Sequence, residues 1–400
     1  MAAPIDFNPY APEFNPDPFP ALRALREQSP IHFWEGGQGW LLSDYDDCIT
    51  VMRDNLRFSA NFQDWELAPA GQDNEFQRVQ SKCLFGLPPV DHTRVRKLIT
   101  PIFSAAAMNR RRDEIRQIIE SELDEVGDVK SFDLMSRFAE FIPTRVITRV
   151  LGIPREHEAM FKNFASLIVR GATPSLNPEE HRKLNEALPE GLDMLRRLVE
   201  ERRIEKRDDV LSELVRAEEE GNRLEMMEML ALIVQIISAG STTTINLIGY
   251  CVLAFLRHPA ALAMINEKPE LLENAVMEVL RYDQFARFGL PRYALEDVEI
   301  RGTRIRKGQM ILPMAIGVMR DPRKFADPDR FDITRDQRLN LAFGHGPHYC
   351  LGAPLARIEG EEAVKALFGR YPNMSLASEP VFEFHPLIRY LQSLHVNTGT

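Results

Sequence analysis

One cysteine stands in a glycine-rich segment, LAFGHGPHYCLGAPLARIE at residues 341–359, and its surroundings favour chemistry. Gly344, Gly346 and Gly352 permit tight turns and close backbone approach around Cys350. A helix-forming run follows directly, and a helix N-terminus stabilises a thiolate through its dipole and its free N–H groups. The segment therefore predicts a thiolate that serves as a nucleophile or as a metal ligand.

Three interpretations of Cys350 follow. A nucleophile needs a base, and His345 and His348 lie close to it in sequence. A metal ligand fits better, because a haem iron needs one protein ligand whereas structural zinc needs several. A buried cysteine without any chemistry is the plain alternative.

The spacing F-x-x-G-x-x-x-C-x-G over residues 343–352 resembles the haem-ligand loop of the cytochrome P450 superfamily. The resemblance implies that Cys350 is the proximal thiolate ligand of haem b. It further implies that Phe343 and Gly344 lie against the haem near that thiolate, and that His348 contacts a haem propionate.

Two more segments resemble propionate-binding positions of the same family. In PPVDHTRVRKL, His92 and Arg96 stand four residues apart and so share a helix face. Arg292, in GLPRYA, matches the arginine that the family carries on a strand. Guanidinium and imidazole groups suit two buried carboxylates, so the resemblance implies haem binding; surface roles are the alternative.

Glu278 and Arg281 stand at i and i+3 on one expected helix face. Taken alone, such a pair is typical of a solvated surface. At about seventy residues before the cysteine, it resembles the buried Glu–Arg pair of the family, completed by Arg330 or Arg335 from DPDRFDITR. We expect these residues to hold the cysteine loop, not to act as catalysts.

The segment AGSTTT at residues 239–244 resembles the place where the family's central helix crosses the haem. The resemblance implies that Ala239 borders the haem and that Thr243 assists oxygen activation. Thr242 replaces the usual acid, and a hydroxyl does not titrate near neutrality, so water or polar groups of the substrate would complete the proton relay. A buried threonine-rich helix without catalytic duty is the alternative.

The expected substrate pocket is largely apolar with a few polar groups, which suits a sizeable hydrophobic molecule that carries some oxygens. Helical spacing places Gln235, Ser238, Ala239, Thr242 or Thr243, and Asn246 along one stripe. The remaining expected lining comprises residues 84–87 with Leu87, residues 167–176, Phe288, Gly289, Leu290 and Ile388.

Over its length the chain resembles soluble bacterial P450s that tailor polyketides and macrolides. This implies a monooxygenase that hydroxylates or epoxidises such a secondary metabolite with O2. A peroxide-driven or rearranging haem-thiolate enzyme, and a non-catalytic haem module that senses gas or carries electrons, are the alternatives.

The resemblance also implies a separate electron donor, a ferredoxin or flavodoxin with its reductase, and we expect a monomer. Such donors are acidic, so a local basic face is expected on this chain. The residues expected to form it are Arg94, Lys97, Arg110, Arg111 and Arg112.

The elements that must position these residues are mostly helical. Apolar residues recur at helical spacing over residues 93–126, 133–151, 156–170, 178–204, 208–220 and 225–256. Alternating patterns with turn residues predict short strands within residues 30–44 and 291–316. We therefore expect one domain over residues 1–400, mainly α with a minor antiparallel β part, and a haem between the long central helix and the helix after the cysteine loop.

Composition excludes other classes of protein. The chain has 400 residues, 49 basic against 59 acidic side chains and a net charge of −10, which argues against nucleic acid as the main partner. Four scattered cysteines form no disulfide framework, so we expect a reducing, cytoplasmic location. The charge-free stretch 229–256 is long enough to cross a membrane, but its hydroxyl and amide side chains favour a buried core helix.

Overall fold

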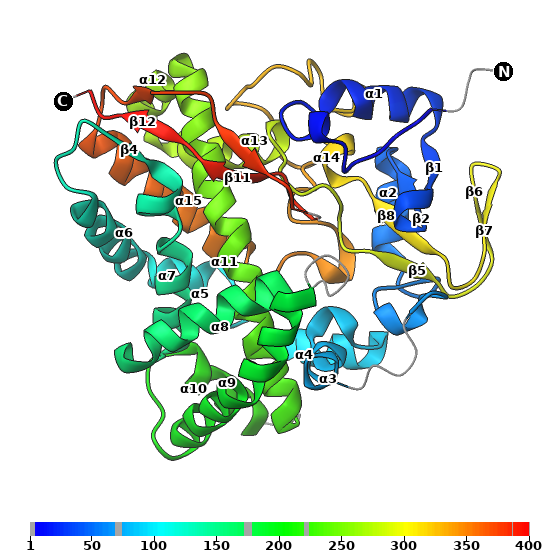
Figure 1. Cartoon of the computed structure of the whole chain (residues 1–400), viewed down its shortest axis with the longest axis horizontal. Coiled ribbons are helices and arrows are strands. Elements are labelled where there is room, and N and C mark those ends of the chain that lie inside the picture. Colours follow the sequence, from blue (N-terminus) through cyan, green and yellow to red (C-terminus); the bar gives the residue numbers. More distant parts are fainter. Residues whose placement is uncertain (1–4, 69–73, 172–177, 220–223, 386, 400) are drawn as a thin grey trace.

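The computed structural model describes residues 5–68, 74–171, 178–219, 224–385 and 387–399. It confirms a mainly helical protein with small sheets (Figure 1). The helices are α1 Phe19–Gln28, α2 Tyr45–Arg53, α3 Glu75–Lys82, α4 Pro89–Ile99, α5 Ala105–Arg110, α6 Arg112–Val126, α7 Ile142–Leu151, α8 Glu158–Gly171, α9 Pro178–Ile204, α10 Val210–Glu219, α11 Met226–Arg257, α12 Pro259–Glu267, α13 Leu272–Tyr282, α14 Ala315–Val318 and α15 Ala353–Arg370.

Short helical turns connect several of these elements. They are the 3-10 turns η1 Pro12–Phe14, η2 Glu35–Gly37, η3 Phe62–Asp64, η4 Leu84–Gly86, η6 Arg155–His157, η7 Pro269–Leu271 and η8 Gly346–His348, and the π-helical turn η5 Met135–Ala139.

The strands of the described residues form four small sheets. They are β1 Ile31–Trp34, β2 Gly39–Leu42, β3 Phe58–Ser59, β4 Ser131–Asp133, β5 Arg292–Ala294, β6 Val298–Ile300, β7 Thr303–Ile305, β8 Met310–Pro313, β9 Ser375–Leu376, β10 Val381–Glu383, β11 Tyr390–Ser393 and β12 His395–Asn397. The largest sheet has the order β1-β2-β8-β5-β3. Its β2–β8 pair is parallel, whereas every other strand pair among the described residues is antiparallel as expected.

Helix α11 runs through the middle of the molecule and packs against α7 and α15 (Figure 1). A capping box begins it, with Glu225 and Glu228 each bonding the other's backbone N–H. It is the one helix of the described chain long and apolar enough to cross a membrane, yet 67% of its most apolar window is buried inside the protein. Such burial is typical of a core helix.

The expected helices over residues 178–204, 208–220 and 225–256 match α9, α10 and α11 closely. The expected single helix over 93–126 is instead three helices, because Pro101 cannot continue α4 and Ser104 begins α5 by accepting the Ala107 N–H. Residues 133–151 are divided in the same way, because the segment leaves a strand, passes through a π turn and enters α7.

Candidate active site

The cysteine loop is tightly folded, as its glycines predict. Gly344 and Gly346 have φ values of 77° and 72°, which side chains rarely tolerate. A Cβ added to Gly346 would lie 2.8 Å from the carbonyl oxygen of Met52, so α2 approaches the loop closely there. The Cys350 N–H donates to the carbonyl of Phe343 at 2.8 Å and closes the loop directly before α15.

Cys350 differs from the other cysteines, because Cys48, Cys83 and Cys251 are buried whereas Cys350 has accessible surface. Burial nevertheless raises the pKa of the Cys350 thiol, although the N–H groups of the α15 N-terminus and the charge of Arg96 lower it. The thiolate-stabilising groups that we expected are therefore present, but in the protein alone the cost of burial exceeds their effect. A bound metal ion supplies the positive charge that deprotonates a coordinating thiol.

Four basic side chains converge beside this loop, and all four are among the expected propionate ligands. The rings of His92 and His348 lie 4.2 Å apart between centroids and 38° apart in plane. Arg96 donates to the carbonyl of Tyr349 at 2.6 Å. Arg292, on β5, lies close enough to His92 and His348 for its charge to lower the pKa of both. His92 and Arg292 are both only 2% exposed.

We call His92, Arg96, Arg292 and His348 the basic cluster. The electrostatics of the basic cluster favour binding of an anion. Burial and the neighbouring positive charges lower the pKa of His92 to about 4 and that of His348 to about 3. Burial lowers the pKa of Arg292 to about 10. Among the described residues no carboxylate pairs with any of the four, and the buried Nε2 of His92 has no hydrogen-bond partner. A ligand with two carboxylates, such as the two propionates of haem, fits this cluster.

A buried network of hydrogen bonds and ion pairs holds the chain segment that leads into the cysteine loop. Glu278 and Arg281, both 0% exposed, form two hydrogen bonds of 2.8 Å. The Arg281 guanidinium also donates to three backbone carbonyls, and Glu278 accepts three further donors. The carbonyls belong to Met319, Pro328 and Arg330, and the donors are the Asp332 N–H, Arg335 Nε and Gln337 Nε2.

The third side chain of this network is Arg335, and our expectation of Arg330 is wrong. Arg335 Nε lies 3.3 Å from Glu278 Oε1, whereas the exposed Arg330 side chain turns to Asp332 and contributes only its carbonyl. The two arginines are five residues apart in one irregular segment, and only its path decides which one points inward.

One stripe of the otherwise buried α11 is accessible. Ala239 and Thr243 are exposed, and Gln235, Ser238 and Thr242 are half-buried. The spacing confirms the expected stripe, except for Asn246.

Asn246 is buried and bonds the Thr242 carbonyl and the Leu391 N–H instead of facing this stripe. The Thr243 hydroxyl donates to the Ala239 carbonyl at 2.6 Å, as mid-helix hydroxyls do, but α11 remains continuous.

The expected pocket segments lie in different parts of the fold. Gln235 Oε1 accepts the Leu84 N–H at 2.7 Å, which ties the 84–87 turn with buried Leu87 to the α11 stripe. Ile388 is buried and forms a β-bridge with Ala286, beside residues 288–290.

Phe288 is half-buried, and its ring stacks on Trp34 with 6.0 Å between the ring centroids, against the N-terminal hydrophobic cluster. Gly289 and Leu290 are half-buried, and the Gly289 N–H donates to the Pro313 carbonyl at 2.7 Å. Part of the expected 167–176 lining, residues 172–176, lies outside the described residues.

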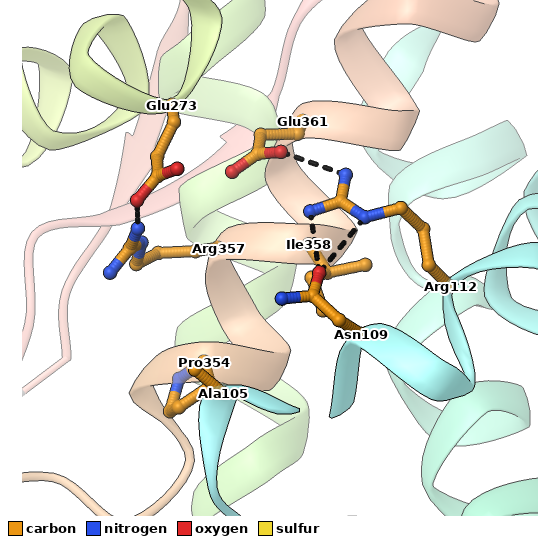
Figure 2. Close-up of a pocket in the computed structure, with 8 residues that line it drawn as sticks. All are labelled: Ala105, Asn109, Arg112, Glu273, Pro354, Arg357, Ile358 and Glu361. Carbon is orange, nitrogen blue, oxygen red and sulfur yellow. Dashed lines mark hydrogen bonds and ion pairs between the residues drawn. The ribbon is translucent and has the colours of Figure 1, made fainter. Parts of the chain in front are cut away.

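Three arginines of the expected basic face are ion-paired with carboxylates of the chain itself. The pairs are Arg94 with Glu228 at 2.6 Å, Arg111 with Glu213 at 3.4 Å, and Arg112 with Glu361 and Glu362 at 2.8 and 2.7 Å. Figure 2 shows Arg112 turned toward α15 across a cavity of about 100 Å³ that also holds the Arg357–Glu273 pair. Most of the predicted face is therefore engaged inside the protein, and that prediction is wrong for Arg94, Arg111 and Arg112.

Two further residues lie at the cysteine loop without any signal in the sequence. Asn340 donates to the Met277 carbonyl at 2.8 Å and accepts the Ala342 N–H at 2.9 Å, so it joins the start of the cysteine loop to α13. Arg53 is exposed next to the backbone that Gly346 approaches. Neither residue stands in a recognisable pattern, and both are placed by contacts between distant segments.

Comparison with known proteins identifies the family. The family model described as Cytochrome P450 matches residues 267–372. The chain is 41% identical over 398 residues to the epothilone C/D epoxidase of Sorangium cellulosum, covering 98% of this chain and 95% of that protein. It is 35% identical to the polyketide biosynthesis cytochrome P450 PksS of Bacillus subtilis, with 98% of each chain covered.

A solved structure described as epothilone B-bound cytochrome P450epoK is similar to this one with a TM-score of 0.93 and 41% identity. The match covers 99% of this chain and 100% of that one. The similarity therefore extends over nearly the whole chain in both sequence and fold. The chain belongs to the cytochrome P450 family and is a haem b-dependent monooxygenase.

Proposed function

We propose that Cys350 ligates the haem iron and that the basic cluster binds the haem propionates, which places the cofactor between α11 and α15. The main support is that four basic groups converge beside the loop that presents Cys350. Among the described residues, no carboxylate pairs with them. Haem bound there supplies the iron at which O2 is activated. Phe343 closes the loop through its carbonyl, and Gly344 supplies the left-handed turn that follows it.

The accessible α11 stripe forms the opposite wall of this site in our proposal. Ala239 leaves room near the haem. The Thr243 hydroxyl donates its one proton to the Ala239 carbonyl, so in our proposal its lone pairs accept a hydrogen bond from the relay, and it passes a proton on only after it rotates away from that carbonyl. Thr242 presents a half-buried hydroxyl next to it but cannot bring a titratable proton from solvent. A hydroxyl of the substrate would then help to order the relay.

We expect Thr242→Glu to raise the amount of product formed per NADPH consumed. With a hydroxyl-free substrate analogue, for which coupling is poor, the increase over the wild type should be about two- to tenfold. With the native substrate the gain should be smaller, because substrate hydroxyls already complete the relay. The measurement is product formed per NADPH consumed, with Thr242→Gln as the uncharged control of similar size. No change with either substrate, or equal gains for Glu and Gln, would refute the relay hypothesis.

The substrate that we propose is a sizeable, partly oxygenated polyketide or macrolide, hydroxylated or epoxidised by the enzyme. The accessible α11 stripe, buried Leu87 and buried Ile388 provide apolar surface with a few hydroxyls. Two relatives described above are named for an epothilone and for polyketide biosynthesis.

A reconstituted assay tests this proposal. The purified protein is supplied with haem, NADPH, a ferredoxin and its reductase, under ¹⁸O2, and is given a panel of macrolides, linear polyketides, steroids and fatty acids. We expect one ¹⁸O atom in the product of a macrolide or polyketide. Product from hydrogen peroxide alone would favour the peroxide-driven alternative, and selective turnover of only fatty acids would contradict the substrate class.

The electron donor that we propose, an acidic ferredoxin or flavodoxin, has a smaller docking surface than the sequence indicated. Arg53, Lys97 and Arg110 are exposed and, among the described residues, have no carboxylate within ion-pair distance. Arg53 adjoins the cysteine loop, Lys97 follows the Arg96 that bonds Tyr349, and Arg110 ends α5, which packs on α15. These three cations therefore surround the side of the loop that an electron donor would approach.

We expect Lys97→Glu combined with Arg110→Glu to slow reduction by an acidic ferredoxin about 10- to 100-fold at low salt, because the charges that steer encounter are reversed. The defect should shrink as salt rises, since screening removes the attraction from the wild type as well. Stopped-flow reduction rates measure this effect. Lys268→Glu, an exposed charge at the end of α12, is the control; an equal loss there would rule out the proposed surface.

A further inference from the structure

Two buried arginines, Arg287 and Arg389, have no role in the site described above. They are 1% and 2% exposed, and among the described residues neither has a carboxylate within ion-pair distance. Burial and the positive charge of Arg389 lower the pKa of Arg287 to about 10. Two unneutralised guanidinium groups side by side in a protein interior are costly, so their hydrogen-bond acceptors decide whether they can stay there.

Those acceptors come from the N-terminal segment Pro9–Pro16. Arg287 donates to the Pro9 carbonyl at 2.9 Å and to the Asn15 side chain. Arg389 donates to the Asn15 carbonyl at 2.8 Å and to the Pro16 carbonyl at 3.3 Å. The Arg287 guanidinium also lies 5.2 Å from the centroid of the Phe14 ring. One short segment thus supplies most of the oxygen acceptors of both buried cations.

Each arginine also adjoins a wall of the proposed substrate pocket. Arg287 stands two residues before Gly289, and Arg389 directly follows Ile388. The two walls are tied together, because the Arg287 N–H donates to the Leu387 carbonyl at 2.9 Å and the Arg389 N–H to the Phe285 carbonyl at 2.7 Å. The position of Ile388 therefore depends on the same backbone that carries the two buried charges.

The central helix α11 forms hydrogen bonds to the backbone that follows Ile388. The Tyr250 hydroxyl donates to the Arg389 carbonyl at 3.1 Å, and Asn246 accepts the Leu391 N–H at 2.9 Å. Both residues lie on α11, within two turns of Thr243. The backbone around Ile388 is thus bonded to the catalytic helix on one side and to the Pro9–Pro16 segment, through the arginines, on the other.

We propose that Arg287 and Arg389 clamp the Pro9–Pro16 segment onto the walls that carry Gly289 and Ile388, so that this N-terminal segment takes part in substrate selection. The inference rests on the proposed pocket, since it assumes that Ile388 faces the substrate. Both arginines are positioning residues, because they act through the wall and not on the substrate.

The test compares Arg287→Met, Arg389→Met and the milder Asn15→Ala. The controls are Asn8→Ala and Arg304→Met. Asn8→Ala removes an exposed acceptor of the Tyr10 N–H directly before the Pro9–Pro16 segment, and Arg304→Met removes an exposed guanidinium paired with Asp297. Hydrogen exchange of the backbone amides of Arg287 and Arg389 reports the clamp. Each arginine variant loses at least two side-chain hydrogen bonds, so this exchange should speed about tenfold or more, with a smaller effect in Asn15→Ala and none in the controls.

Two ligand affinities measure substrate selection. Imidazole needs only the haem iron, whereas clotrimazole must also fit the pocket. Their ratio should change about fivefold or more in the clamp variants and stay constant in the controls. Exchange that stays at the wild-type rate in folded variants would overturn the clamp. Faster exchange with an unchanged affinity ratio would overturn the role in selection and would show that the proposed pocket, not the clamp, is misplaced.

Discussion

Replacing Cys350 by alanine should remove monooxygenase activity while the protein stays folded. Alanine cannot bind iron, and loss of a direct ligand should exceed the roughly 10- to 100-fold effect of losing a supporting group around a metal. We therefore expect turnover to fall by more than about 100-fold. The loop itself should persist, because its closing contact, from the Cys350 N–H to the Phe343 carbonyl, is made by the backbone.

The matched control is Cys251→Ala. Cys251 is fully buried in α11, and burial keeps it a thiol by raising its pKa. Its replacement should cost about 1 kcal/mol of stability through a small cavity and should leave turnover unchanged. Product formation by reconstituted protein, normalised to folded protein by circular dichroism, measures both variants. A Cys350→Ala variant as active as Cys251→Ala would exclude Cys350 as the haem ligand.

Replacing Arg281 by methionine should give the largest loss of stability. The change leaves the carboxylate of Glu278 buried without its closest cation and removes donors from three backbone carbonyls. Breaking a buried pair on one side costs about 3–5 kcal/mol. Arg335, the Asp332 N–H and Gln337 still contact Glu278, so the lower part of this range is expected.

Urea unfolding monitored by circular dichroism measures this loss, and haem content after purification reports its effect on the loop. Arg304→Met is the control, since it breaks a solvent-exposed pair, and such pairs contribute little to stability. Adding Glu278→Gln to Arg281→Met should recover part of the stability, because the second change removes the stranded charge. Equal losses in Arg281→Met and Arg304→Met would refute the structural role of the pair.

The parts of the site that could be predicted from sequence are those that a short segment determines. The Gly344–Cys350 turn follows from local backbone geometry, and the α11 stripe, apart from Asn246, follows from helical spacing. His92 and Arg96 on α4 are distant in sequence from Arg292 on β5, and only the resemblance to a family brought the two segments together before the structure did.

The parts that could not be predicted depend on partners far along the chain. Arg112 looked like an exposed charge in sequence, but Glu361 and Glu362 fold against it from about 250 residues away. The residue type was compatible with the expected role, and a tertiary contact that leaves no local pattern decided against it.

The spectrum of the reduced protein with carbon monoxide tests the central claim most directly, because the position of its Soret band reports the ligand opposite the gas. If Cys350 ligates the haem iron as a thiolate, the band lies far to the red of that of a histidine-ligated haem, and Cys350→Ala loses the feature. A wild-type protein that binds haem without this red-shifted band, or a Cys350→Ala variant that retains it, would contradict the account.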